Sequence, residues 1–332
     1  QFRLGMSGTP FRSDDVQIAF LNYDGAQGLP EYNFFYGQAL AKGYVAPVQF
    51  SFRNALIRLV DPRAGDTPIT LELRQDHGDS EGIKLRGAYA EGSRYSEAII
   101  EQANAHLKSL HPTDGAAAGL VIASNISHAD RIAEYIRNTL NERCEIVHSD
   151  QDNRDKIKKF KKNKDQWIVS VGMISEGVDI PRLRVLVFLS AVTTRLYFHQ
   201  AVGRVVRLHH QNKTHLEQSG FIYLPPTPAF TELAAEFEDE ILHILGDDAP
   251  EPNANRVGDR EGNNELETFE VLDSESWEDG ATFGGATFTQ EEIDRIRTEV
   301  SKIKVPFFQA MPEGMQNQLM EEFKKHYNEK NS

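Results

Sequence analysis

The hydrophobic residues between positions 94 and 228 follow two patterns that alternate along the chain. Short runs in which every residue is apolar, such as 120–123 (LVIA), predict strands that are buried on both faces. Between these runs, apolar residues recur every three or four positions, as Ile99, Ala103 and Leu107 do, which predicts amphipathic helices. We expect strands at residues 120–123, 144–147, 167–171, 185–189 and 221–224. Strands that alternate with helices in this way predict an α/β fold, a parallel sheet with helices on both faces.

The segments on either side of this region are less regular. Residues 22–93 predict a short helix stopped by Gly43, a strand interrupted by Pro47, and a β-containing connector or surface insertion. Residues 229–245 predict a helix that packs back on the domain, and the acidic stretch 246–285 predicts a flexible linker. Ser127 and Asp130 are spaced as a capping box at the start of a helix.

Charge and composition narrow the class of protein. The formal net charge is −14 over 332 residues, but residues 229–332 hold 25 acidic and 9 basic residues, so that the acidity lies in the tail and leaves room for a basic groove elsewhere. The single cysteine, Cys144, excludes an internal disulfide and fits the reducing cytoplasm. No apolar run is long enough to span a membrane, and nothing resembles a signal peptide.

The richest chemistry lies in residues 199–207 (HQAVGRVVR). Arg204 and Arg207 are three residues apart, which on a helix places them on one face, where both can point into one cleft. Gly203 permits close backbone approach, and Gln200 can hydrogen-bond a phosphate. Arginines presented in this way stabilise a phosphoryl group during transfer. The alternative is a surface helix with two solvated arginines.

Three other polar segments follow or accompany the predicted strands. Residues 175–179 (SEGVD) come directly after the strand at 167–171, and we expect them at the carboxyl edge of the sheet, where ligands bind in such folds. Asp179 has the alternative role of capping the turn before Pro181. Ser124 and Asn125 follow the first buried strand, with a turn and helix cap as the alternative. Residues 4–12 (LGMSGTPFR) predict a strand and a turn.

In this order, the segments 4–12, 175–181 and 199–207 resemble motifs III, V and VI of the superfamily-2 helicases, most similar to the type I/III restriction-enzyme motors. These proteins are nucleic-acid-dependent ATPases built from two RecA-like domains. The resemblance implies that Arg204 and Arg207 are arginine fingers, that Gln200 senses the γ-phosphate, and that Asp179 accepts from the nucleotide ribose. Many family members have His where Gln200 stands, which leaves the subgroup open. Gly177 and Gly203 would lie beside the nucleotide, and the implied nucleic-acid contacts are Ser7, Thr9, Ser124, Asn125, Ser175 and Glu176.

The resemblance also implies a domain division. Residues 1–21 would end a first RecA-like domain, 22–93 would connect the domains, 94–228 would form the second domain, and 229–332 would form a helical tail with its linker at 246–285. The implied ligand is ATP with Mg²⁺, held mainly by the first domain. The implied partners are nucleic acid, with DNA favoured, that first domain, and a nuclease or methyltransferase subunit. We expect no membrane partner and no metal site in the chain itself.

What the sequence lacks limits the function expected of it. It contains no Gly-x-x-x-x-Gly-Lys-Ser/Thr and no Asp-Glu-x-His/Asp box, so that we expect a fragment that hydrolyses no ATP by itself. Two alternatives remain. One is a non-catalytic RecA-like module that binds nucleic acid or protein, and the other is a scaffold subunit that recruits a nuclease.

Overall fold

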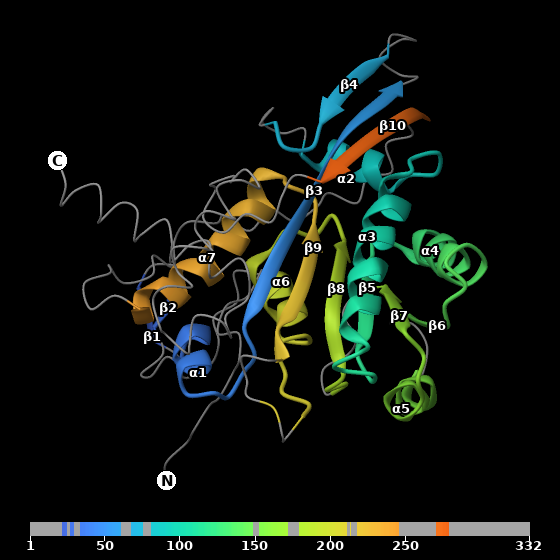
Figure 1. Cartoon of the computed structure of the whole chain (residues 1–332). Coiled ribbons are helices and arrows are strands. Elements are labelled where there is room, and N and C mark those ends of the chain that lie inside the picture. The colour runs from blue at the N-terminus through green and yellow to red at the C-terminus, as the bar shows by residue number, and fades with distance from the viewer. Residues whose placement is uncertain are drawn as a thin grey trace, which may run out of the picture.

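The fold is known from a computed structural model (Figure 1), which describes residues 22–24, 27–29, 34–60, 68–75, 81–148, 153–171, 179–210, 213, 218–245 and 270–278. A parallel sheet forms the centre, with the strand order β3-β9-β8-β5-β7-β6. The strands are β3 (Val48–Val60), β5 (Ala118–Ala123), β6 (Cys144–His148), β7 (Trp167–Val171), β8 (Leu183–Leu189) and β9 (Gly220–Leu224). The five expected strands are therefore confirmed, and so is the α/β class.

Helices cover both faces of this sheet. On one face lie α3 (Tyr95–Leu110) and α4 (Ile126–Asn138), and His106 of α3 contacts the rings of Phe221 and Tyr223 in β9. Because side chains alternate along a strand, Phe188 of β8 points to the opposite face. There it packs against α6 (Arg195–Val202) and α7 (Pro228–Leu245) through Phe198 and Phe230. The short helix α5 (Arg154–Lys162) lies beside β6, the edge strand.

β3 continues beyond the parallel sheet and forms a second, antiparallel one. Its first half pairs with β9, and its second half pairs with β4 (Ile69–Glu72) and β10 (Glu270–Glu278). The buried side of the strand changes on the way. Phe50 and Phe52 face α6 and α7, whereas Ile57 and Leu59 are buried against α2 (Glu81–Tyr89), whose Gly87 lies close to both. One strand thus joins two layers of the core.

The remaining described elements flank this core. β1 (Asn22–Asp24) and β2 (Gln27–Leu29) form a two-stranded antiparallel hairpin. The short helix α1 (Tyr36–Ala41) packs on α7 and has Lys42 as its C-cap. Gly43 follows the cap, and its φ of 70° suits a glycine. β3 begins directly after Pro47, so that the proline precedes the strand instead of interrupting it.

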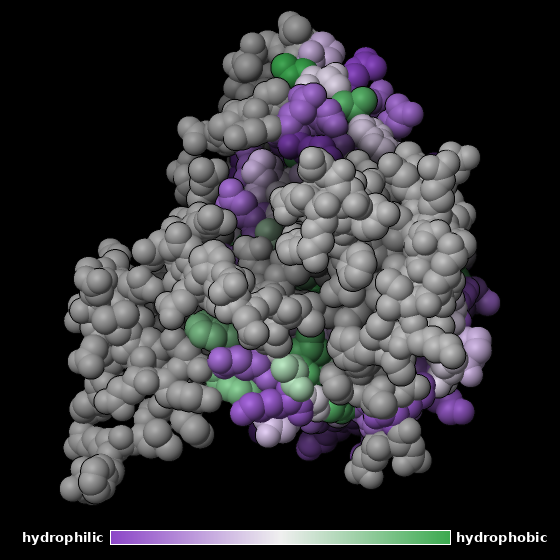
Figure 2. Space-filling view, turned by 60° about the vertical axis from the view of Figure 1, so that its left-hand side comes forward, coloured by the Kyte–Doolittle hydropathy of each residue, from purple (hydrophilic) through white to green (hydrophobic). Residues whose placement is uncertain are grey.

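The antiparallel extension alters two expectations. The connector expected at 22–93 contributes β3 to the main sheet, and the linker expected to be flexible at 246–285 contains strand β10. Neither pairing has a local sequence signal, because the partner of β10 lies more than 200 residues earlier. In Figure 2 the described surface of this extension, at the top, is mainly hydrophilic. The exposed large apolar side chains of the extension are Leu56, Ile69, Leu272 and Trp277. No helix in the described ranges is long and apolar enough to cross a membrane.

The parallel sheet depends on one close approach between neighbouring strands. Gly119 of β5 lies opposite Trp167 of β7, and a Cβ atom on Gly119 would come within 2.2 Å of the indole ring. The ring is fully buried, and its Nε1 donates a hydrogen bond to Asn104 Oδ1 at 3.0 Å. The Trp167 ring therefore occupies the space that a side chain at position 119 would fill.

We predict that Gly119→Ala lowers the free energy of unfolding by about 1–3 kcal/mol, because the added methyl group forces the indole from its place. Gly115→Ala is the matched control, since its Cβ would lie 3.6 Å from the nearest atom, the His111 carbonyl oxygen. Urea unfolding of both variants tests this prediction. Equal midpoints for the two would contradict the packing described.

Candidate nucleotide and nucleic-acid sites

Ser124 and Asn125 lie at the carboxyl end of β5, where α4 begins. Asn125 is the N-cap of α4, and its Oδ1 accepts the backbone N–H of His128 at 2.9 Å. The capping box expected from Ser127 and Asp130 is therefore wrong, because the helix begins earlier, at Ile126. The alternative role of Asn125 as a helix cap is present in the structure.

His128 links Ser124 to the neighbouring helix. Its Nδ1 lies 2.9 Å from Ser124 Oγ, its Nε2 lies 2.9 Å from Ser96 Oγ, and its ring stacks on Tyr89. The imidazole is buried, and this burial, together with the charge of Arg131, lowers its pKa to about 3. His128 is therefore neutral at physiological pH and holds the carboxyl end of β5 against α3.

A hollow of about 160 Å³ opens beside this cluster, between α3 and α4. Tyr89, Ser93, Glu97, Arg131 and Tyr135 are among its lining residues. The guanidinium of Arg131 is held there by the Tyr89 carbonyl at 2.8 Å and by Ser127 Oγ at 3.2 Å. The carboxyl end of the sheet thus presents mixed charge and several hydroxyl groups.

The second group of expected site residues contains a direct contact between Asp179 and Arg207. Arg207 Nη1 donates to Asp179 Oδ1, although 28 residues separate the two. The Arg207 side chain is 32% exposed and that of Asp179 is 57% exposed, so that water reaches the pair. The structure therefore brings together one residue from each of the two segments, 175–181 and 199–207, that carry the resemblance.

Arg204 and Arg207 do not share a helical face. α6 ends at Val202 with Gly203 as its C-cap, and the next residues form tight turns in which Arg204 N–H donates to the Ala201 carbonyl at 3.0 Å. The expected single face is therefore wrong, because the chain leaves the helix before either arginine. Arg204 and Gln200 are both half-buried.

Charged side chains fix α6 on α7. Arg195 Nε donates to Glu236 Oε2 at 2.6 Å, and His199 Nε2 lies 3.4 Å from the same oxygen. Burial alone would raise the pKa of Glu236, but the hydrogen bond from His199 and the charge of Arg195 hold it below its ordinary value. The helix that precedes Arg204 and Arg207 therefore has a fixed position on the domain.

Several of the expected contacts lie outside the described residues. They are Ser7, Thr9, Ser175, Glu176 and Gly177.

The two described groups lie at opposite ends of the sheet. Ser124 follows the carboxyl end of β5, whereas Arg207 and Asp179 lie near the amino end of β8, since Arg184 of β8 donates to the Arg207 carbonyl at 2.9 Å. β5 and β8 are parallel neighbours, so that the groups are about 20 Å apart along the strands. The expectation that residues 175–179 lie at the carboxyl edge is wrong for Asp179, because Asp179 contacts Arg207 near the amino end of β8.

Comparison with known proteins identifies the central part of the chain, because residues 102–209 match the family described as helicase conserved C-terminal domain. This part of the chain is therefore similar to helicase C-terminal domains. The resemblance to superfamily-2 helicases is thereby confirmed for this region. The matched residues run from the middle of α3 to the segment after α6.

Two relatives and one solved structure illustrate the likeness. A Mycobacterium leprae protein is 33% identical over 77% of this chain, and a candidate helicase of Sulfolobus islandicus filamentous virus is 26% identical over 64% of it. The chain spans only 43% and 36% of these relatives. A fragment of a candidate HsdR subunit of a type I restriction enzyme from Vibrio vulnificus is 18% identical, covering 62% of this chain and 37% of its own, with a TM-score of 0.42.

Sequence reasoning missed a group of polar residues that holds the backbone at Arg207. These are Arg184, Asp114 and Gln218, all nearly buried. A signal was present in Arg184, which interrupts an otherwise apolar strand run. A charged residue inside such a run marks either a buried pair or an error in the strand boundary.

The buried His128 generates a test by pH. Its pKa is below that of an unfolded histidine, so the unfolded state binds the extra proton and stability falls as the pH falls from about 6.5 toward 3. We predict that His128→Gln loses this component, which has a limiting slope of about 1.4 kcal/mol per pH unit. Urea unfolding of both proteins at pH 7.5, 6.5 and 5.5 measures the difference, and parallel pH profiles would contradict the prediction.

Proposed function

We propose that this chain is the C-terminal part of an ATP-dependent helicase or translocase and that Arg204 and Arg207 are its arginine fingers. The observation that carries the proposal is the contact between Asp179 and Arg207, both of which lie in the segment 102–209 that matches the helicase family. A carboxylate and a guanidinium side by side are the two groups that a nucleotide requires of this lobe, one for its ribose and one for its γ-phosphate.

The contact with Asp179 does not remove Arg207 from this role. An ion pair as exposed as this one contributes only about 0–1 kcal/mol, because water screens it and both side chains lose freedom. A triphosphate offers several charged oxygens and can receive a guanidinium through two parallel hydrogen bonds. In our proposal Arg207 moves from Asp179 to the γ-phosphate when the lobes close, and Asp179 is then free to accept from the ribose hydroxyl.

The nucleotide and the nucleic acid occupy opposite ends of the sheet in this proposal. Gly203, Gln200, Arg204 and Arg207 serve the nucleotide at the amino end. Gly177, which lies outside the described residues, is assigned to the nucleotide on the resemblance alone. Ser124 and Asn125 lie at the carboxyl end and serve the nucleic acid, for which we favour DNA. Because the Asn125 side chain already caps α4 and the Ser124 hydroxyl already bonds the His128 ring, we assign the contact there to the start of the helix, which attracts phosphate.

The other half of the ATPase site belongs to a separate lobe in our proposal. The sequence has no phosphate-cradling loop and no acidic box for Mg²⁺, so this chain supplies the fingers and the partner lobe holds ATP and the metal ion. A nuclease or methyltransferase subunit remains a proposed further partner. Separate lobes allow ATP binding and release to drive stepping along a strand.

We predict that Arg207→Ala and Arg204→Ala in the complete protein each lower nucleic-acid-stimulated ATP turnover by on the order of a thousandfold, as for other arginine fingers. Arg58→Ala is the matched control, because Arg58 is an exposed arginine on the antiparallel extension. Steady-state phosphate release measures the effect. Turnover close to the unaltered rate in both finger variants would reject the proposal.

We also predict that the 332-residue chain by itself releases phosphate from ATP no faster than a buffer blank, because it lacks the phosphate-binding half of the site. The same chain is expected to retain binding to single-stranded DNA, measured by fluorescence anisotropy at low salt. DNA binding by the complete protein without any ATP turnover would instead support the non-catalytic module.

A further inference from the structure

The main chain around Arg207 is held by buried polar groups. Arg184 Nη1 donates to the Arg207 carbonyl at 2.9 Å, and Gln218 Oε1 accepts the N–H groups of His209 at 2.7 Å and His210 at 2.8 Å. On the other side, the Val206 carbonyl accepts the N–H of Ala46 at 2.7 Å. Successive peptide groups on both sides of the Arg207 side chain are therefore fixed.

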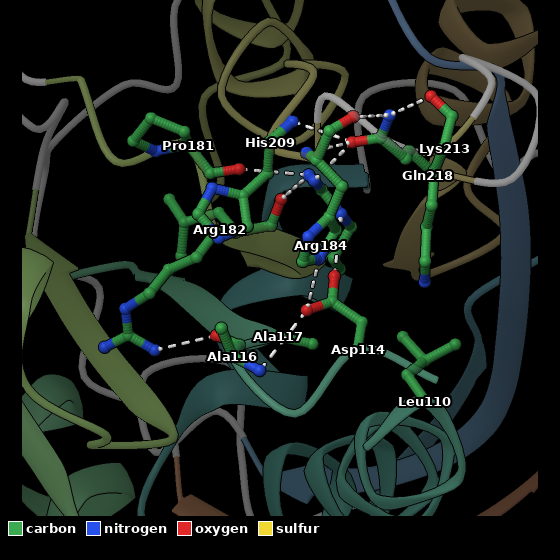
Figure 3. A network of polar contacts seen from close by, with 12 residues as sticks. Leu110, Asp114, Ala116, Ala117, Pro181, Arg182, Arg184, His209, Lys213 and Gln218 are labelled. Carbon is green, nitrogen blue, oxygen red and sulfur yellow. Dashed lines mark hydrogen bonds and ion pairs between the residues drawn. The ribbon is translucent and has the colours of Figure 1, made fainter. Parts of the chain in front are cut away.

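These groups are joined to one another at the amino end of the sheet. Figure 3 shows Arg184 between Asp114 on one side and Pro181, His209 and Gln218 on the other. Arg184 Nε lies 3.6 Å from Asp114 Oδ2, and its Nη2 lies 3.5 Å from Gln218 Oε1. The Asp114 carboxylate also receives His210 Nε2 at 2.9 Å. We call Arg184, Asp114 and Gln218 the amino-edge cluster.

Burying the charges of the amino-edge cluster has a large desolvation free energy. Arg184 is 2% exposed and Asp114 is 8% exposed, and taking both charges out of water costs several kcal/mol before their attraction repays it. Burial alone would raise the pKa of Asp114, yet the hydrogen bond and charge of His210 and the charge of Arg184 hold it below its ordinary value. Apolar residues of similar size would serve stability equally well.

The cluster makes hydrogen bonds to particular peptide groups, which apolar residues cannot do. Arg184 donates to the carbonyl of residue 207, and Gln218 accepts the N–H groups of residues 209 and 210. These hydrogen bonds fix the segment that follows α6. The Arg207 side chain itself remains partly exposed and reaches Asp179. A fixed backbone with a side chain free to change partners is the arrangement that an arginine finger requires, because small errors in position cost rate.

We propose that Arg184, Asp114 and Gln218 are positioning residues that set the place from which Arg207 reaches its phosphate. This inference rests on the function proposed above for Arg207. It extends that function to residues at the start of β8, before β5 and before β9, none of which touches the nucleotide. Loss of the cluster shifts the guanidinium and leaves the binding of ATP and nucleic acid unchanged.

The test is a set of double-mutant cycles in the complete protein. Arg184→Lys keeps the charge opposite Asp114 but removes the guanidinium from the Arg207 carbonyl, and Gln218→Leu keeps the size but removes the amide oxygen and the amide nitrogen. Each is expected to lower kcat about 10- to 100-fold, with KM for ATP and the Kd for DNA within about twofold. In the Arg207→Ala background the same changes are expected to have no further effect, because they act through Arg207.

Controls separate positioning from a loss of folding. Arg58→Lys makes the same exchange at an exposed arginine and is expected to leave kcat unchanged. Circular-dichroism melting identifies any cluster variant that does not fold. Such a variant is replaced by Asp114→Asn, which keeps the size and shape of the side chain and loses only its charge. For Asp114→Asn we expect a smaller loss of kcat, about tenfold, with the same dependence on Arg207.

The outcomes distinguish the two proposals. Normal turnover of Arg207→Ala rejects the function proposed for this arginine, and the positioning role with it. Strongly reduced turnover of Arg207→Ala, combined with normal kcat in folded cluster variants, overturns the positioning role alone. Losses that multiply with that of Arg207→Ala also overturn it, since residues acting through Arg207 cannot add to its removal.

Discussion

The contact between Asp179 and Arg207 is possible only because the chain that carries Arg207 is tied down at the amino end of the sheet. α6 stops at Val202, and the following turns would be free to move if nothing held them. The side chains of Arg184 in β8 and of Gln218 before β9, and the peptide N–H of Ala46 before β3, make hydrogen bonds to the backbone of this segment. The exposed ion pair is thus a weak contact on a rigid base. That combination allows one partner to be exchanged without a change in the fold.

The sheet itself separates two kinds of chemistry. At the carboxyl end of β5, a neutral buried histidine and an asparagine cap fix the start of α4. At the amino end of β8, charged groups are concentrated, with Arg184 and Asp114 buried and Arg207 and Asp179 reaching water. Under the function proposed above, these two edges contact two different ligands at once. Coupling between those ligands would then pass through the strands that connect the edges.

Much of the fold could be predicted from the sequence, because the strands β5 to β9 contain short, mostly apolar runs and the apolar residues of the helices between them recur at helical spacing. The pairing of β3 with β9 and β10 could not, because those contacts join segments that are far apart and carry no motif. For the site, the spacing of the arginines selected Arg207 and the resemblance to superfamily-2 helicases selected Asp179, and these two side chains contact each other. Their place at the amino edge was missed, since the end of α6 depends on how residues 203–207 pack. Arg184 and Gln218 were missed because a buried arginine or glutamine has meaning only once its partners are known.

β3 gives the domain an unusual order of assembly. Its outer half pairs with β10, in which Ser276 lies opposite Ala55. The ribosome makes Ser276 more than 200 residues after Ala55, so that this pair can form only late in synthesis. Contacts of such long sequence separation form slowly, since a large loop must close first. Until then the outer half of β3 presents an unpaired hydrogen-bonding edge, which is where other chains add to a sheet. The acidic segment that contains β10 therefore covers this edge of β3 late in folding. A chain that ends before β10 would be prone to aggregate through the exposed edge of β3.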